Sequence, residues 1–261
     1  MQLQDLTPRT EATFLRCLHD EKPDDPRVIA LRRHWVDSRL EKGYRAKVLH
    51  LDSGEIAGLG QYIPIEESFI QGERLMVILC LWVHGYDHHI GNRQGNGYGR
   101  FMLEQIEAEI LATDVEGIVA WGMDFPYWNP VAFYEHMGYQ RVDQEGPAVL
   151  VWKPRHAAAI PPRFYRQLKK PQARDGQVTL DVFHNGWCTG SCGQCITARD
   201  AVAGMAEGLR YREVDTGQRE NLSEWGITDG TYLDGEPFRP DEPPFSSEEL
   251  RREILDRVGA R

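Results

Sequence analysis

The sequence has no apolar run near the roughly 18 residues that a membrane-spanning helix needs. Its first residues also lack the basic segment and apolar core of a secretory signal. The sequence has fewer basic than acidic residues: 30 Lys and Arg compared with 40 Asp and Glu, which gives a net charge of −10. These absences predict a cytoplasmic protein whose partners include neither membrane nor nucleic acid.

Cysteine is also scarce. Five residues in 261 do not make the disulfide framework of a small secreted domain. Three of the five nevertheless fall within eight positions, at 188, 192 and 195. In a reducing compartment, clustered thiols are more often reactive or metal-binding than structural. Cys17 and Cys80 lie in apolar segments, which predicts that they belong to the core.

The first 150 residues show the pattern of a mixed α/β sheet, and a hydrophobic fraction of 41% supports a packed core. Strands are predicted at 1–6, 46–51, 56–63, 75–83, 118–123 and 148–152. Helices are predicted to begin at Thr7-Pro8 and Asp25-Pro26, after the glycines at 95–99, and at 131–137.

A basic segment broken by prolines, residues 154–176, separates this part from a second one. Residues 177–261 predict a strand at 178–183, a helix at 196–209, a strand at 211–214 and a hairpin at 231–238. Ser246 and Glu249 form a capping box for a last helix. The sequence therefore predicts domains at 1–153 and 177–261, joined by a linker at 154–176.

The most informative stretch is a glycine-rich turn between the strand 75–83 and the helix after it. It consists of Gln94, Gly95, Asn96, Gly97, Tyr98, Gly99 and Arg100. Glycines allow positive φ, and backbone N–H groups at a helix N-terminus bind phosphate. The third glycine comes too early for a dinucleotide fingerprint, and no Gly-Lys-Ser/Thr follows as in a Walker loop.

This turn resembles the Gln/Arg-x-x-Gly-x-Gly/Ala signature of the GNAT acetyltransferases. Residues 129–139, Asn-Pro-Val-Ala-Phe-Tyr-Glu-His-Met-Gly-Tyr, resemble a second GNAT segment near the end of that domain. The resemblance implies a GNAT mixed sheet over residues 1–153 and acetyl transfer from acetyl-CoA to a small-molecule amine. It also implies that Val83 and the turn residues bind acetyl-CoA, and that Asn129 caps a helix and contacts the pantetheine arm.

The resemblance further assigns Tyr134 as the residue that protonates the coenzyme sulfur. Family bases are often acidic residues near the central strands, so Glu66 and Asp87 are the predicted general bases, with Glu67 and His84 as alternatives. The connection 84–93 is longer than in the family. We interpret it as a polar loop that faces the substrate; a metal site of His84, Asp87, His88 and His89 is the alternative.

The cysteine cluster comprises Cys188, Cys192 and Cys195, with His184 shortly before it. A thiol at a helix N-terminus has a lowered pKa. The cluster and the order β-α-β-(α)-β-β-α resemble a thioredoxin fold, and the two-domain architecture resembles proteins with a YoaP-like C-terminal domain. The proline that thioredoxins carry opposite the Cys pair is missing at 228–231. A redox pair, a metal or metalloid site with His184 as fourth ligand, a single reactive thiol and a structural role all stay open.

Two functions therefore compete. The first is an acetyl-CoA-dependent N-acetyltransferase with an accessory thiol-rich domain. The second is a thiol-based metal-binding or redox protein on a degenerate GNAT scaffold. The GNAT resemblance also implies that a second subunit of a homodimer, or a second domain, closes the substrate cleft.

Overall fold

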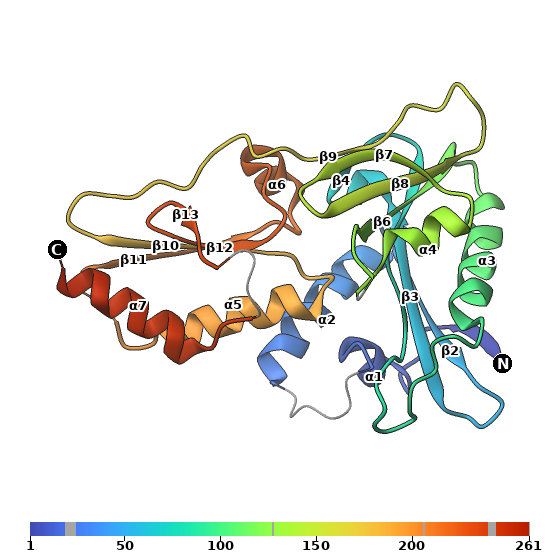
Figure 1. Ribbon diagram of the computed structural model, residues 1–261, viewed down its shortest axis with the longest axis horizontal. Coiled ribbons are helices and arrows are strands. Elements are labelled where there is room, and N and C mark those ends of the chain that lie inside the picture. Colours follow the sequence, from blue (N-terminus) through green and yellow to red (C-terminus); the bar gives the residue numbers. More distant parts are fainter. Residues whose placement is uncertain (19–24, 127, 206, 240–243, 261) are drawn as a thin grey trace. The chain divides into compact units, whose positions relative to one another are not determined.

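The computed structural model describes residues 1–18, 25–126, 128–205, 207–239 and 244–260, which form two compact units (Figure 1). Unit 1 comprises Met1–Asp24 and Val36–Phe164, and unit 2 comprises Asp25–Trp35 and Tyr165–Arg261. This division differs from the boundaries predicted from the sequence chiefly at residues 25–35, which group with the C-terminal part of the chain. None of the described helices combines the length and the apolar character needed to cross a membrane.

Unit 1 is built on a seven-stranded mixed sheet of order β1-β2-β3-β5-β6-β8-β7. The strands are β1 (Gln2–Asp5), β2 (Arg45–His50), β3 (Ile56–Pro64), β5 (Leu75–Val83), β6 (Gly117–Met123), β7 (Gln140–Glu145) and β8 (Ala148–Pro154). Neighbouring strands are antiparallel except β5 and β6, which run parallel. A small second sheet pairs β4 (Ile70–Gln71) with β9 (Arg163–Phe164).

The helices of unit 1 cover both faces of this sheet. They are α1 (Glu11–Leu15), the Val36–Leu40 end of α2 (Pro26–Leu40), the short 3-10 helix η1 (Ile65–Glu67), α3 (Tyr98–Leu111) and α4 (Val131–His136). Strand β3 is buried at seven successive positions, as expected for a strand covered on both faces. Figure 1 shows α3 and α4 on one face and α1 on the other.

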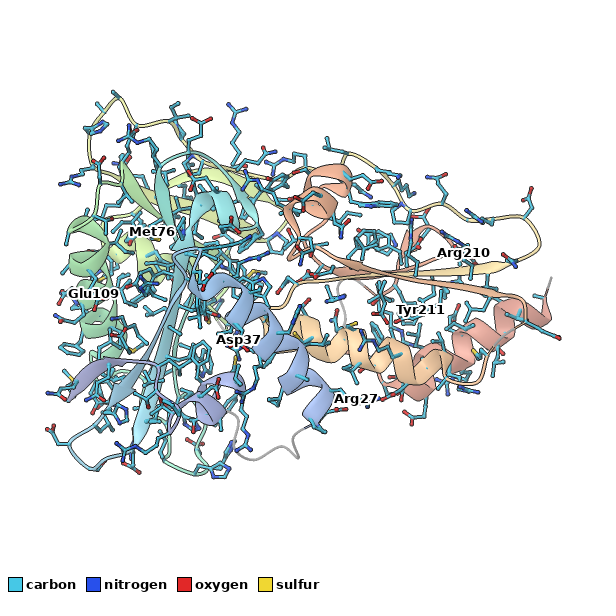
Figure 2. All side chains as sticks on the ribbon, turned by 180° about the vertical axis from the view of Figure 1, so that it is seen from behind. Arg27, Asp37, Met76, Glu109, Arg210 and Tyr211 are labelled. Atoms are coloured by element: carbon cyan, nitrogen blue, oxygen red, sulfur yellow. The ribbon has the colours of Figure 1, made fainter. Side chains whose placement is uncertain are left out.

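Apolar residues of α3 and α4 form the main core of unit 1 with the central strands. This core includes Met76, Ile78, Leu103, Ile106, Ile110, Ile118, Val131, Tyr134 and Val149. Figure 2 labels Met76 on β5 and Glu109 on α3. The Glu109 carboxylate accepts hydrogen bonds from Lys47 Nζ (2.8 Å) and Tyr62 Oη (2.7 Å), so it ties α3 to β2 and β3.

Unit 2 contains a four-stranded sheet of order β11-β10-β12-β13. Its elements are β10 (Val178–His184), α5 (Thr189–Val202), β11 (Leu209–Asp215), α6 (Arg219–Trp225), β12 (Gly230–Leu233), β13 (Glu236–Pro237) and α7 (Ser247–Gly259). Strands β10 and β11 are parallel, and the remaining pairs are antiparallel. Helices α5 and α7 share one core with β10, whereas Trp225 of α6 packs with Phe183 and Val214 in another.

Three elements correct the expectations from the sequence. The helix expected at 196–209 is α5, which begins seven residues earlier at Thr189. The buried residues Cys192, Cys195 and Ala198 recur at helical spacing, and their packing outweighs the low helix propensity of Gly190 and Gly193. The helix expected at Thr7 begins at Glu11, and strand β7 was not predicted because its six residues are mostly polar.

Candidate active site

The two parallel strands at the centre of unit 1 separate after a short paired stretch. Among the described residues, β5 and β6 pair only from Leu75 to Val77. Strand β5 then carries one extra residue, Leu79, because Gln61 of β3 faces Cys80 and Tyr62 faces Ile78. A bulge of this kind bends the strand and increases its twist. The strands therefore open toward the carboxyl end of β5.

A cleft of about 300 Å³ lies at this end of β5. Its described lining residues are Leu81, Trp82, Val83, Arg93, Gln94, Gly95, Gly97, Tyr98, Gly99, Arg100, Pro126, Asn129, Pro130 and Phe133. They come from the end of β5, the glycine turn, the first turn of α3 and the loop between β6 and α4. The structure thus brings together nearly all residues that the sequence predicted to bind acetyl-CoA.

The glycine turn leaves space beside its backbone. Gly95 and Gly97 have φ values of +76° and +78°, and a Cβ added to either would meet no atom within 4 Å. Gly97 is the N-cap of α3, and its carbonyl accepts the hydrogen bond from the N–H of Phe101. The amides of the first turn, residues 98–100, therefore precede the helical hydrogen-bond ladder and suit an anion.

Side-chain amides hold the turn in place. Gln94 Nε2 donates to the carbonyl of Val83 (3.2 Å), which ties the turn to the end of β5. Asn96 Nδ2 donates to the carbonyls of Arg93 (3.0 Å) and Gln94 (3.1 Å), which closes the turn on itself. In this structure Gln94 and Asn96 therefore support the turn's shape.

The cleft carries positive charge in an acidic protein. Among its described lining residues, Arg93 and Arg100 are charged and none is acidic. Arg93 Nη2 lies 3.2 Å from Glu55, whereas Arg100 Nη2 lies 3.1 Å from the ring nitrogen Nε2 of His136. The contacts described for Arg100 thus leave its charge available to an anion.

Asn129 lies in the cleft, but its predicted capping role is wrong. The N-cap of α4 is Pro130, and no side chain caps that helix. Asn129 has a φ of +43°, its Nδ2 donates to the carbonyl of Trp121 (2.9 Å), and its own carbonyl accepts from Met123 (2.8 Å). The residue fastens the loop before α4 to the end of β6, and a contact with the pantetheine arm stays a prediction.

Tyr134 lies behind the cleft wall rather than on it. Phe133 lines the cleft, whereas Tyr134 is 1% exposed and packs against Phe133 and Tyr139 with ring centroids 5.2 and 5.6 Å apart. Burial, with a smaller effect of Cys80, raises the pKa of Tyr134 far above its ordinary value. The phenol therefore keeps its proton at neutral pH.

The two predicted bases lie far apart. Glu66 accepts a hydrogen bond from the N–H of Arg74 (2.7 Å), directly before the first residue of β5. The nine residues of β5 span roughly 26 Å, so Glu66 lies at the opposite end of the strand from the cleft. Glu66 therefore does not line the cleft, and its role as a general base stays a prediction. Asp87 is exposed in the connection that follows β5.

The connection 84–93 is held by aromatic contacts. Tyr86 and His88 stack with ring centroids 5.1 Å apart and an interplanar angle of 11°. His84 is 2% exposed, and its Nδ1 lies 3.0 Å from the carbonyl of Gly91. Among the described residues, the ligand atoms of His84, Asp87, His88 and His89 do not converge as a metal site.

The chain is similar in sequence to a curated protein. No known family model matches the chain. It is 23% identical over 216 residues to the uncharacterized N-acetyltransferase YoaP of Bacillus subtilis strain 168, a match that covers 78% of this chain and 79% of that protein. The similarity supports a GNAT-type N-acetyltransferase. The aligned stretch is longer than unit 1, so it includes part of unit 2.

Several solved structures are also similar to this chain. An acetyltransferase of Thermus thermophilus is 21% identical, with a TM-score of 0.44 over 59% of this chain and 97% of that one. Ribosomal-protein-alanine N-acetyltransferase of Brucella melitensis is 18% identical, with a TM-score of 0.45 over 59% and 99%. YhbS of Escherichia coli, in complex with CoA, is 14% identical, with a TM-score of 0.43 over 62% and 88%.

The cysteines of unit 2 differ from each other in environment. Cys188 is half-buried and is the N-cap of α5, whereas Cys192 and Cys195 are fully buried. The helix thus begins directly after Cys188, before both buried thiols, whereas the sequence predicted its start at residue 196. Ser191 lies three positions after Cys188. Its hydroxyl accepts a hydrogen bond from the N–H of Asn185 (2.9 Å).

The buried Cys195 thiol does not have the lowered pKa expected at a helix start. Burial, reinforced by Glu213, raises the pKa of Cys195 to about 12. Burial also lowers the pKa of His184, although Asp215 and Glu213 oppose that effect. The ligand atoms of His184, Cys195 and Glu213 lie within 4.8 Å of one another. Glu213 was missed from the sequence, where the only signal is a carboxylate in the middle of a strand.

Proposed function

We propose that this protein is an acetyl-CoA-dependent N-acetyltransferase that acts on a small-molecule amine. The observation that carries the proposal is the cleft at the open end of β5, where the glycine turn meets the N-terminus of α3. Gly95 and Gly97 keep the space beside the backbone free, and Arg100 adds positive charge. Phosphate groups fit such a site through backbone amides and the helix dipole.

The residues on the cleft fit an extended cofactor. Beyond the bulge, β5 still pairs with β3 along one edge but no longer pairs with β6 along the other. The backbone N–H and C=O groups on that second edge are therefore outside the β5–β6 ladder. These groups suit the amides of a pantetheine arm, which would lie between Val83 and Asn129. Bound acetyl-CoA supplies the activated acetyl group and the thiol leaving group.

Tyr134 supplies the acid in this proposal. Its phenol lies directly behind the cleft-lining Phe133, carries its proton at neutral pH and donates it to the departing sulfur, so that CoA leaves as the thiol. Asp87 in the connection after β5 is the proposed base and takes a proton from the amine, directly or through one water. Backbone N–H groups of β5 stabilise the developing oxyanion.

Unit 2 is proposed to be thioredoxin-like. Its strand order β11-β10-β12-β13 and the positions of α5, α6 and α7 support this view, as does Cys188 at the N-terminus of α5. General disulfide exchange is not favoured, because Ser191 stands where the second thiol is expected and Cys192 is buried. We accordingly propose an accessory role for unit 2 beside an N-terminal acetyltransferase domain, in a cytoplasmic protein.

The proposed activity is tested by thiol release. The full-length protein is mixed with acetyl-CoA and a panel of amines, amino acids and aminoglycoside antibiotics, and free CoA is measured. We expect one class of amine to raise the release rate well above hydrolysis. Hydrolysis-level release with every amine would contradict an amine acetyltransferase.

A further inference from the structure

Three different ligand types meet inside unit 2. His184 ends β10, Glu213 lies in β11 and Cys195 lies in the second turn of α5. In the parallel register Val182 pairs with Glu213 and His184 with Asp215, so His184 and Glu213 share the face that α5 covers. His184 is 7% exposed and Cys195 is 0% exposed. The fold thus places a sulfur, an imidazole nitrogen and a carboxylate oxygen at one buried point.

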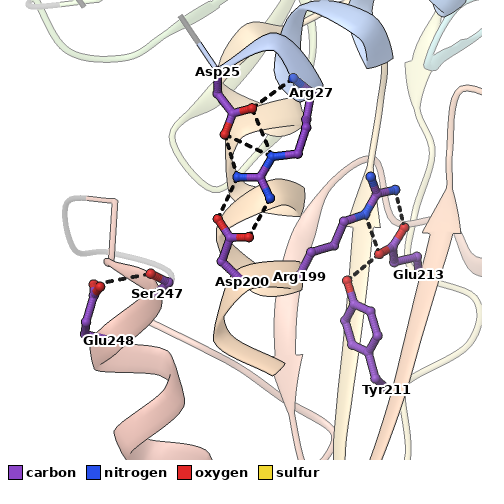
Figure 3. A network of polar contacts seen from close by, with 8 residues as sticks. All are labelled: Asp25, Arg27, Arg199, Asp200, Tyr211, Glu213, Ser247 and Glu248. Atoms are coloured by element: carbon purple, nitrogen blue, oxygen red, sulfur yellow. Dashed lines mark hydrogen bonds and ion pairs between the residues drawn. The ribbon is translucent and has the colours of Figure 1, made fainter. Parts of the chain in front are cut away.

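The carboxylate of this group is held by neighbours. Arg199 Nε and Nη2 each donate to one oxygen of Glu213 at 2.7 Å, and Tyr211 Oη donates at 2.5 Å (Figure 3). Arg199 stands one helical turn after Cys195, so α5 brings both to the same place. Each carboxylate oxygen has about two lone pairs, so the two oxygens of Glu213 can bind a metal ion in addition to accepting these three hydrogen bonds. Orientation of a ligating carboxylate by such partners is usual in metal sites.

The histidine gives an independent indication that this place binds a ligand. His184 Nδ1 is buried, and among the described residues it has no hydrogen-bond partner. A buried polar atom without a partner costs free energy, and most such atoms in native proteins are satisfied. A bound ion next to the ring would supply that interaction.

We propose that His184, Cys195 and Glu213 bind a zinc ion. A mixed sulfur, nitrogen and oxygen set suits Zn²⁺, whereas Mg²⁺ and Ca²⁺ prefer oxygen alone. Bond lengths to zinc of about 2.0–2.3 Å place tetrahedral ligands roughly 3.3–3.8 Å apart, so atoms within 4.8 Å need only a small closure. As the zinc–sulfur bond forms, Cys195 releases its proton to water, and a water molecule takes the fourth position.

The local charges balance when zinc is bound. The Cys195 thiolate and the Glu213 carboxylate offset the two charges of the ion. Arg199 adds one positive charge. Asp215, which pairs with His184 across the two strands, adds one negative charge and offsets it. Charge balance favours burial of such a group in a low-dielectric interior.

This site differs from the one predicted from the sequence. That prediction joined Cys188, Cys192 and Cys195 with His184. In the structure, Cys192 Sγ donates to the carbonyl of Asn185 (3.5 Å), and Cys188 lies at the helix N-cap. Only one of the three thiols therefore belongs to the proposed site, and Glu213 takes the place of the others.

The test uses zinc and cobalt with the full-length protein. Metal-free protein is titrated with ZnCl₂ against a chromophoric chelator, and bound zinc is counted by mass spectrometry. We expect one zinc per chain, with affinity reduced at least about 10-fold in Cys195→Ser and His184→Asn. Cys188→Ser is the matched control and keeps wild-type affinity. We also expect Co²⁺ bound to the wild-type protein to give a thiolate-to-cobalt charge-transfer band. This measurement needs no variant, so it holds even if the variants fail to fold.

Three results would overturn the proposal. They are substoichiometric zinc in the wild type, zinc affinity unchanged in Cys195→Ser, or affinity lost in Cys188→Ser as well. None of these measurements depends on acetyl transfer, so the zinc site and the proposed enzyme activity can fail separately.

Discussion

Among single residues, Tyr134 is the one on which the proposed proton transfer to sulfur depends most. Its phenol is buried behind Phe133, and it keeps its proton because burial raises its pKa. A core aromatic would have the same burial, so position alone does not separate packing from catalysis. Kinetics do, because proton donation to the leaving sulfur acts on the transition state only.

Tyr134→Phe removes the hydroxyl and keeps the ring. We expect kcat to fall roughly 100-fold while the affinity for acetyl-CoA changes little. Tyr139→Phe is the matched control: Tyr139 is also buried, at 4% exposed, and packs against Tyr134. The measurement is steady-state kinetics together with acetyl-CoA binding. An unchanged kcat with weaker binding would show that Tyr134 only packs.

Residues within one local motif were predictable, and residues that meet through the fold were not. Gln94 to Arg100 form one turn, so their spacing already indicated a phosphate site, and the structure places most of them on one cleft. His184 and Glu213 are 29 positions apart and meet only because β10 and β11 pair in parallel. The distance of Glu66 from the cleft was unpredictable for the same reason, since it depends on which end of β5 adjoins the cleft.

At the scale of elements, most strands were predictable because buried strands are continuous apolar runs. The start of α5 was not, because glycines at 190 and 193 resemble loop residues until the buried face of the helix is known. The last helix was predicted and is confirmed. Ser246 Oγ accepts from the N–H of Glu249, the Glu249 side chain accepts from the N–H of Ser246, and Leu250 and Ile254 are buried.

Ser246→Ala tests this helix start. The variant loses a cap that satisfies a first-turn amide, so we expect the free energy of unfolding to fall by about 1 kcal/mol. Ser247→Ala is the control, because the Ser247 hydroxyl donates to Glu248 and does not cap the helix. Urea unfolding of both variants provides the measurement. Equal losses in the two would contradict the capping role.

The same cap predicts a pH dependence. Hydrogen bonds from Ser246 hold the pKa of Glu249 below its ordinary value. A carboxylate with a lowered pKa in the folded state stabilises the fold above its unfolded pKa, and that stabilisation disappears as the pH falls through the folded-state pKa. Glu249→Gln should therefore be less stable than the wild type at neutral pH and approach it in acid. A difference independent of pH would contradict this.

Across the whole chain, the first part of α2 groups differently from what chain order predicts. Residues 25–35 group with the C-terminal segment in unit 2. A Cβ at Gly186 would lie 2.2 Å from Trp35 Cβ, so the absent side chain lets Trp35 pack there. Arg27 pairs with Asp200 at 2.6 Å (Figure 3). Sequence patterns reveal that a helix has an apolar face but not which surface covers it.

Gly186→Ala tests this packing. The added methyl group would displace Trp35, and overpacking of this kind costs about 1–3 kcal/mol. Gly193→Ala is the matched control, because a Cβ there meets no atom within 4 Å and helical Ala is favoured over Gly. Thermal unfolding should show a lower Tm for Gly186→Ala only. An unchanged Tm would mean that Trp35 does not pack on Gly186.

The glycine turn is proposed to bind the phosphates of acetyl-CoA, and isothermal titration with acetyl-CoA measures this binding. We expect saturable binding with one site per chain, weakened about 10-fold or more in Gly97→Ala, because a side chain at φ +78° is strained and enters the free space. Gly176→Ala carries a similar strain at φ +74°, does not line the cleft, and should bind as the wild type does. Absence of binding at millimolar acetyl-CoA, or equal affinities in Gly97→Ala and the wild type, would contradict the account.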